Sequence, residues 1–74
     1  MNKQFEVMYV DEVEGVTDIR KVKGEDCLDV MVKYLDDDFD KEDVEKLMVS
    51  QNLVKKVWSF SFGDEEGTIV VREL

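Results

Sequence analysis

Acidic residues crowd one fourteen-residue stretch of the chain, YLDDDFDKEDVEKL, which holds seven of them. Carboxylates at this density could hold a calcium ion, and an EF-hand loop needs oxygen ligands at its positions 1, 3 and 5. Asp36, Asp38 and Asp40 have that spacing. The loop also needs glycine at position 6 for a sharp turn and glutamate at position 12 to close the site, but Lys41 and Leu47 stand there. We therefore expect no metal site in this stretch.

The second half of the stretch has the pattern of a helix start. Asp40 stands at the N-cap position and Asp43 three residues later, so the carboxylate of Asp40 can accept a hydrogen bond from the backbone N–H of Asp43. Phe39 before the cap and Val44 after it occupy the two positions of a hydrophobic staple. Local structure thus accounts for residues 39–46.

Asp36, Asp37 and Asp38 have no such local explanation. They follow the predicted end of the first helix, where the helix dipole is negative and each acid costs about 0.3–1 kcal/mol. Residues that break a local rule without a visible gain often serve a function. The alternative is that they only give a small domain a strongly charged, well-solvated surface.

The excess of negative charge belongs to the middle of the chain. The 74 residues carry nineteen acids and ten bases, a net charge of -9. Residues 25–45 hold ten of the acids and two lysines, while the other 53 residues hold nine acids and eight bases. Acids three or four residues apart on a helix lie about 4.5–6 Å apart along its axis, and DNA carries a charge about every 3.4 Å on each strand. The two spacings are of the same order, so a helical acidic surface can imitate a nucleic-acid strand.

Few residues of the chain suit catalysis. Histidine is absent and Cys27 is the only cysteine, which excludes Ser-His and Cys-His nucleophiles, His-ligated metals, intramolecular disulfides and cysteine-only zinc sites. The glycines form no phosphate-binding loop. With nineteen acids, some carboxylate pair will reach a catalytic separation by chance. We expect neither an enzyme nor a cofactor.

Three aromatic residues, Trp58, Phe60 and Phe62, alternate along one predicted strand, as they do in sheets that stack RNA bases. They share the apolar side of that strand, with Ser59 and Ser61 on the other, which favours a place in the core. Affinity for nucleic acid comes mainly from neutralised phosphates, and the net charge of -9 opposes it. Direct nucleic-acid binding is therefore not expected.

The hydrophobic pattern predicts four strands and two helices in the order ββααββ. Strands are predicted at 3–10, 16–23, 53–62 and 68–74, helices at about 25–36 and 40–50, and turns at 11–15 and 63–67. Residues 1–74 should form a single α+β domain, a four-stranded antiparallel sheet with both helices on one face. Cys27 is expected to be a small buried hydrophobe. The other core residues expected are Phe5, Val7, Leu28, Met31, Leu35, Val44, Leu47, Trp58, Phe60 and Val70.

These features indicate a non-enzymatic binding protein. Its most concrete form is an inhibitor that imitates nucleic acid and occupies the groove of a basic nucleic-acid-binding protein, for example a nuclease. The alternative is a subunit or adaptor whose contact surface is apolar and whose acidic helical face only solubilises it. A homodimer also stays open. The binding surface under the first hypothesis consists of Asp26, Asp29, Asp36, Asp37, Asp38, Asp40, Glu42 and Asp43.

The ends and the cysteine content of the chain favour a cytoplasmic protein. The start, MNKQFEVMYV, meets Glu6 before any apolar signal region can form. No uncharged run reaches the roughly 20 residues of a membrane span. A single cysteine is typical of a reducing compartment. We expect a protein partner and no membrane contact.

Overall fold

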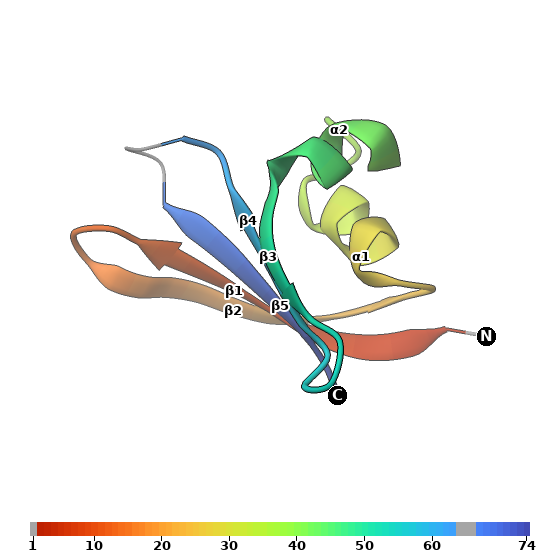
Figure 1. The fold of residues 1–74 in the computed structure, drawn as a ribbon. Helices are drawn as coiled ribbons and strands as arrows, with labels where there is room; N and C mark the ends of the chain where they lie inside the picture. Colours follow the sequence, from red (N-terminus) through yellow and green to blue (C-terminus); the bar gives the residue numbers. More distant parts are fainter. Residues whose placement is uncertain (1, 64–66) are drawn as a thin grey trace.

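Residues 2–63 and 67–74, which a computed structural model describes, form a five-stranded antiparallel sheet with two helices on one of its faces (Figure 1). The elements are β1 (Lys3–Asp11), β2 (Gly15–Gly24), α1 (Cys27–Tyr34), α2 (Lys41–Leu47), β3 (Met48–Asn52), β4 (Val57–Ser61) and β5 (Thr68–Glu73). Across the sheet the strands follow the order β2-β1-β5-β4-β3. Part of the turn predicted at 63–67 lies outside the described residues.

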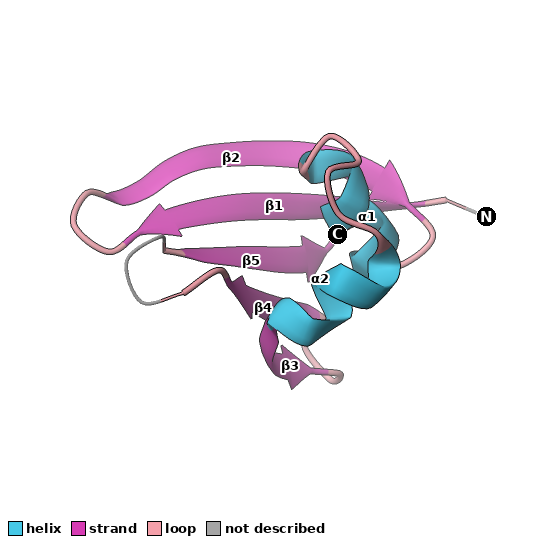
Figure 2. Cartoon of the chain, turned by 90° about the horizontal axis from the view of Figure 1, so that it is seen from above, coloured by secondary structure: helices cyan, strands magenta, loops and turns pink. Residues whose placement is uncertain are grey.

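The helices cover only one end of the sheet (Figure 2), and no helix of the described residues covers its opposite face, which is bare (Figure 1). α1 packs on β1, β2 and β5, and α2 packs on β4. The approach of α1 is close, because a Cβ atom added to Gly24 at the end of β2 would stand 2.8 Å from the side chain of Val30. The predicted α+β class, with both helices on one face, is confirmed.

The predicted number of strands is wrong, because the described residues contain a fifth strand, β3. The sequence predicts that the second helix runs to residue 50, since Met48 continues its apolar face. The helix instead ends at Leu47, and the backbone at Met48 is extended, with φ −67° and ψ 125°. β-branched Val49 favours this conformation, and pairing with β4, where Ser50 faces Ser59, satisfies the backbone.

The strand predicted at 53–62 begins late, at Val57. A tight turn joins it to β3, in which Asn52 Oδ1 accepts a hydrogen bond from the backbone N–H of Lys55 at 2.9 Å. Val54, which the alternating pattern assigns to the apolar side of the strand, is 93% exposed in this turn. The first helix is also shorter than predicted, as α1 spans Cys27–Tyr34.

The core lies between the helices and the sheet and agrees with much of the prediction. Full burial is confirmed for Phe5, Val7, Met31, Val44 and Phe60. Leu28, Leu35, Leu47 and Trp58 are partly buried at its margin. Val70 lies on the bare face instead, since β5 pairs Ile69 with Phe60 and Val71 with Val7, and it is these odd-numbered residues that meet the helices. Val30 is fully buried although it was not among the predicted core residues, because α1 lies so close to β2.

Candidate functional site

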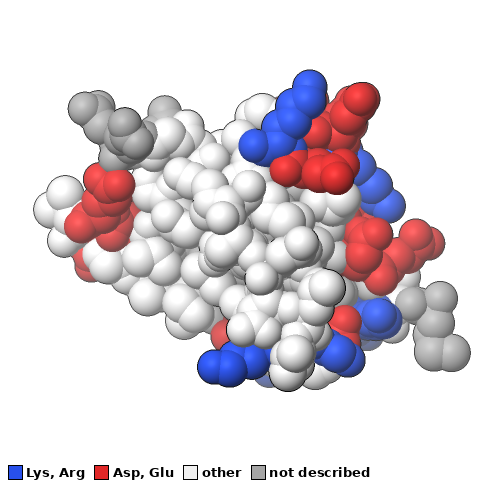
Figure 3. Space-filling model, in the orientation of Figure 1, with Lys and Arg blue, Asp and Glu red and all other residues white. Residues whose placement is uncertain are grey.

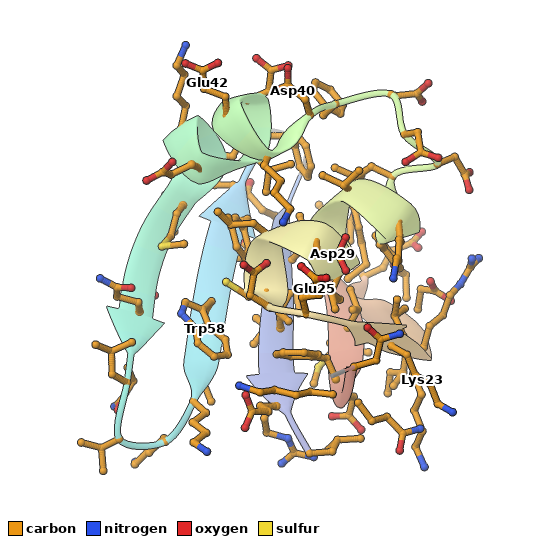
Figure 4. The ribbon with its side chains drawn as sticks, turned by 90° about the vertical axis from the view of Figure 1, so that its right-hand side faces the viewer. Lys23, Glu25, Asp29, Asp40, Glu42 and Trp58 are labelled. Carbon is orange, nitrogen blue, oxygen red and sulfur yellow. The ribbon has the colours of Figure 1, made fainter. Side chains whose placement is uncertain are left out.

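The eight acids predicted to form the binding surface all lie in the helical layer, on α1, on α2 or beside their ends. We call this set the acidic surface: Asp26, Asp29, Asp36, Asp37, Asp38, Asp40, Glu42 and Asp43. Figure 4 shows Asp29 on the outer side of α1, and Asp40 and Glu42 at the start of α2. None of the eight is buried. The fold therefore gathers them on one side of the molecule.

Two of these acids hold the start of α1. Asp26 is its N-cap, and its carboxylate accepts a hydrogen bond from the backbone N–H of Asp29 at 2.8 Å. Asp29 in turn accepts one from the backbone N–H of Glu25 at 3.0 Å and forms an ion pair with Lys33 at 3.2 Å. The hydrogen bond from Glu25, aided by Lys33, holds the pKa of Asp29 below its ordinary value. These carboxylates therefore already serve the fold.

Asp40 caps α2 as predicted. Its carboxylate accepts a hydrogen bond from the backbone N–H of Asp43 at 2.9 Å. Phe39, however, lies against the ring of Phe62, with the ring centroids 6.1 Å apart. This contact packs the residue before the start of α2 against the residue that follows β4, and so holds the start of the helix next to the sheet.

Asp36 and Asp37 turn out to have a local role that the sequence hides. Both adopt left-handed backbone, with φ 55° and 62°. The N–H of Asp36 donates to Lys33 O at 3.1 Å and that of Asp37 to Val32 O at 3.0 Å, the pattern of a Schellman motif. Aspartate tolerates left-handed backbone better than most residues other than glycine. The expectation that local structure does not use these residues is thus wrong for their backbone, although a neutral asparagine would serve equally.

The charges of the remaining acids are free of local partners. Within the described part of the chain, no hydrogen bond or ion pair engages the carboxylates of Asp36, Asp37, Asp38, Glu42 and Asp43. All five side chains are exposed. They form the portion of the acidic surface that is available to another molecule.

The bare face of the sheet has the opposite character, and the sequence analysis did not identify it. We call it the open sheet face: Gln4, Glu6, Met8, Val10, Ile19, Lys21, Lys23, Ser50, Asn52, Val57, Ser59, Ser61, Thr68, Val70 and Arg72. It contains one acid and three bases, so the rest of the chain holds eighteen acids and seven bases. The one acid, Glu6, is paired with Arg72 at 3.1 Å.

The strand register arranges this face in rows that cross the sheet. One row joins Ile19, Met8, Val70, Ser59 and Ser50, each beside the next on the neighbouring strand. The side chain of Ile19 is 57% exposed at its end. Neighbouring strands lie about 4.8 Å apart, so this row is about 19 Å long. Of its apolar members, Met8 lies on the side of β1 predicted to face away from the core, whereas Val70 had been predicted to lie in the core.

The view of Figure 3 shows how the charges divide. Acidic side chains lie at the β1–β2 turn and over the helices, where basic side chains stand beside them, and further basic side chains lie at the lower edge, near the β3–β4 turn. The broad area between them carries no charged side chain in this view. The molecule is therefore electrically asymmetric.

A polar cluster ties α1 to the edge strand β2. The hydroxyl of Tyr34 donates to Asp18 Oδ2 at 2.8 Å, and Arg20 Nε lies 2.9 Å from the same oxygen. The guanidinium of Arg20 also lies over the Tyr34 ring, 5.6 Å from its centroid. Burial and the carboxylate of Asp18 raise the pKa of Tyr34 to about 12. This cluster fixes the helical layer on the sheet.

Cys27 is a core residue, as predicted, with 7% of its surface exposed. Burial raises the pKa of its thiol to about 11, so the thiol stays protonated at neutral pH and is a poor nucleophile. In residues 2–63 and 67–74, no group of three or more histidine, cysteine, aspartate or glutamate side chains is placed to hold a metal ion.

The aromatic residues of β4 and its end lie on the face of the sheet that the helices cover, away from the open sheet face. Phe60 is fully buried. Trp58 packs against Phe5, with ring centroids 6.1 Å apart, and Phe62 packs against Phe39. Their place in and around the core, which the strand pattern predicts, is confirmed.

None of the described helices is both long enough and apolar enough to cross a lipid bilayer. Comparisons of the chain with models of protein families, with curated proteins and with solved structures found no match.

Proposed function

We propose that this protein is a non-enzymatic inhibitor that binds a basic protein through the acidic surface and occupies the site where that partner binds nucleic acid. The separation of charge supports the proposal: ten acids and three lysines lie in residues 25–47, which form the helical layer, whereas the open sheet face carries one acid and three bases. A surface that served only to solubilise the protein would not need this division.

The free carboxylates of the acidic surface supply the means of binding. Asp36, Asp37 and Asp38 follow one another in the loop, and Glu42 and Asp43 lie in the first turn of α2. Like the phosphates of a nucleic acid, they present several negative charges within a short stretch of chain. Opposite charge accelerates encounter, so such a protein would bind fast at low salt and compete with nucleic acid for the same groove. We place this activity in the cytoplasm, where a lone thiol stays reduced.

Capture from a nuclease-treated lysate of the host cell, followed by elution in salt steps, tests this proposal. The immobilised protein should retain a basic nucleic-acid-binding protein that moderate salt or added duplex DNA releases. The D36N/D37N/D38N variant should retain less of it. An E12Q/E14Q variant, which removes acids from the distant β1–β2 turn, should retain as much as the parent. A partner that withstands high salt and ignores DNA contradicts the proposal.

The open sheet face supports a second candidate function, an adaptor whose acidic layer only solubilises it. The face places Met8, Val70 and the 57%-exposed Ile19 in one apolar row. An Ile19→Glu variant should then lose the partner while D36N/D37N/D38N keeps it. The reverse outcome favours the inhibitor.

A further inference from the structure

A cleft of about 400 Å³ opens at the end of the sheet where α1 begins. Its floor is apolar and consists of Phe5, Cys27, Leu28, Met48 and Trp58. Its rim is polar and consists of Lys3, Asp26, Glu45, Gln51 and Glu73. Figure 4 shows Trp58 on the surface of β4 below the helices, which do not cover it in this view. The cleft is thus distinct from both the outer side of the helices and the open sheet face.

The rim keeps a negative charge, because its basic residue is already engaged in an ion pair with one of its acids. Glu73 forms ion pairs with Lys3 at 3.5 Å and with Lys56 at 3.0 Å, and Lys56 is the main cause that lowers the pKa of Glu73. Asp26 uses one oxygen to cap α1. Among the described residues, no hydrogen bond or ion pair engages the carboxylate of Glu45, and this residue is exposed. The cleft therefore offers the carboxylate of Glu45 and part of that of Asp26 above an apolar floor.

An apolar floor under free carboxylates fits a side chain that has an apolar stem and a cationic end. Trp58 gives the floor a large ring, and tryptophan is the aromatic residue that attracts cations most strongly. A volume of about 400 Å³ lies near the lower end of the range for ligand pockets, which suits one inserted side chain better than a large cofactor.

We propose that this cleft binds an arginine side chain of the partner protein. Arginine fits better than lysine, because its planar guanidinium both stacks on an aromatic ring and donates to a carboxylate. This inference rests on the proposed function, in which the partner is a basic protein. A second copy of the chain is a poorer source of the arginine than a basic protein, since it has only two arginines and these are paired, Arg20 with Asp18 and Arg72 with Glu6.

Trp58 is the only tryptophan of the chain, so its emission and the NMR signal of its indole N–H report on the cleft alone. The probe is N-acetyl-arginine amide, with N-acetyl-citrulline amide as its uncharged counterpart. We expect saturable changes in at least one of the two signals with the arginine probe at millimolar concentrations. Citrulline should bind about two- to fivefold more weakly, the difference expected for loss of a cation beside a ring and a carboxylate.

Glu45→Gln should weaken binding of the arginine probe by a similar factor, whereas Glu12→Gln, at the far turn, should leave it unchanged. Equal binding of arginine and citrulline, equal effects of the two substitutions, or no saturable signal would each overturn the assignment. Tighter binding of the lysine counterpart would overturn the choice of arginine. The assay uses no partner protein, so its failure is separate from failure of the proposed function, which the capture experiment measures.

Discussion

Replacing Asp36, Asp37 and Asp38 together by asparagine should stabilise the fold. Asparagine keeps the shape of aspartate and accepts the left-handed backbone that the first two residues adopt, with φ 55° and 62°. The change removes negative charge from the C-terminal end of α1, where each charge costs about 0.3–1 kcal/mol. The unfavourable interaction with the helix dipole fades beyond the last turn, and all three residues are exposed. We therefore expect a gain of about 0.5–1 kcal/mol in the free energy of unfolding.

Replacing the same three residues by alanine separates the backbone from the charge. Alanine removes the same charges, but left-handed backbone costs an ordinary residue about 1–2 kcal/mol, of which aspartate avoids a part. At two such positions this loss should exceed the electrostatic gain. We expect the alanine variant to be about 1 kcal/mol less stable than the parent.

Urea unfolding, followed by the emission of Trp58, measures both variants. The dependence of the free energy on urea should be the same for all three proteins, and the advantage of the asparagine variant should shrink in high salt, which screens exposed charges. An alanine variant as stable as the asparagine variant would refute the left-handed turn. An asparagine variant that unfolds more easily than the parent would mean that these carboxylates hold the fold and are not spare for binding.

Other changes test the remaining features of the fold. Phe60→Ala removes a fully buried ring and should cost about 3–5 kcal/mol, which calorimetry or urea unfolding would detect as near-complete loss of the folded state; a well-folded variant contradicts the core. Asp40→Ala should cost about 0.5–2 kcal/mol through loss of the α2 cap, and Asp40→Asn much less. The pKa of Tyr34 is raised from 10 to about 12, so the folded state favours the protonated hydroxyl. The stabilisation of the fold by this hydroxyl is therefore complete below pH 10 and is lost as the pH rises from 10 to 12. Tyr34→Phe should flatten this part of the stability curve, and an unchanged curve argues against the burial of the Tyr34 hydroxyl and its hydrogen bond to Asp18.

The start of α2 and the buried faces of β1 and β4 were predictable because short-range patterns determine them. Asp40 and Asp43 stand at the spacing of an N-cap, and the structure has that hydrogen bond. Phe5, Val7 and Phe60 alternate with polar residues, and the structure buries them. In the first case one local hydrogen bond determines where the helix begins, and in the second the two-residue alternation of a strand determines which side chains are buried.

The predictions for β3 and for the face of β5 were wrong because strand pairing in the folded protein overrides the local sequence pattern there. The segment Met48–Asn52 continues an apolar helical stripe and then becomes polar, which locally indicates the end of a helix, yet it pairs with β4 as an edge strand. The side of β5 that faces the core depends on its register with Phe60 and Val7, and register is not visible in a six-residue strand with three consecutive apolar residues.

For the candidate site, too, some features could be predicted from the sequence and others could not. The sequence located the acidic surface, because charge runs are visible in one dimension. It did not reveal that Asp36 and Asp37 form a left-handed turn, since aspartate is an uncommon choice for that conformation. The open sheet face and the cleft at Trp58 each combine residues from several strands, so only the folded chain displays them.

The proposed function requires that the free carboxylates of the acidic surface attract a basic partner to the site where that partner binds nucleic acid. The most direct test is the association rate of the captured partner with the parent protein and with D36N/D37N/D38N, measured by stopped flow over a series of salt concentrations. We predict that the parent associates faster at low salt, that its rate falls more steeply with salt, and that duplex DNA blocks association of both proteins. Equal rates and equal salt slopes for the two proteins, or a rate that is indifferent to DNA, would contradict the account.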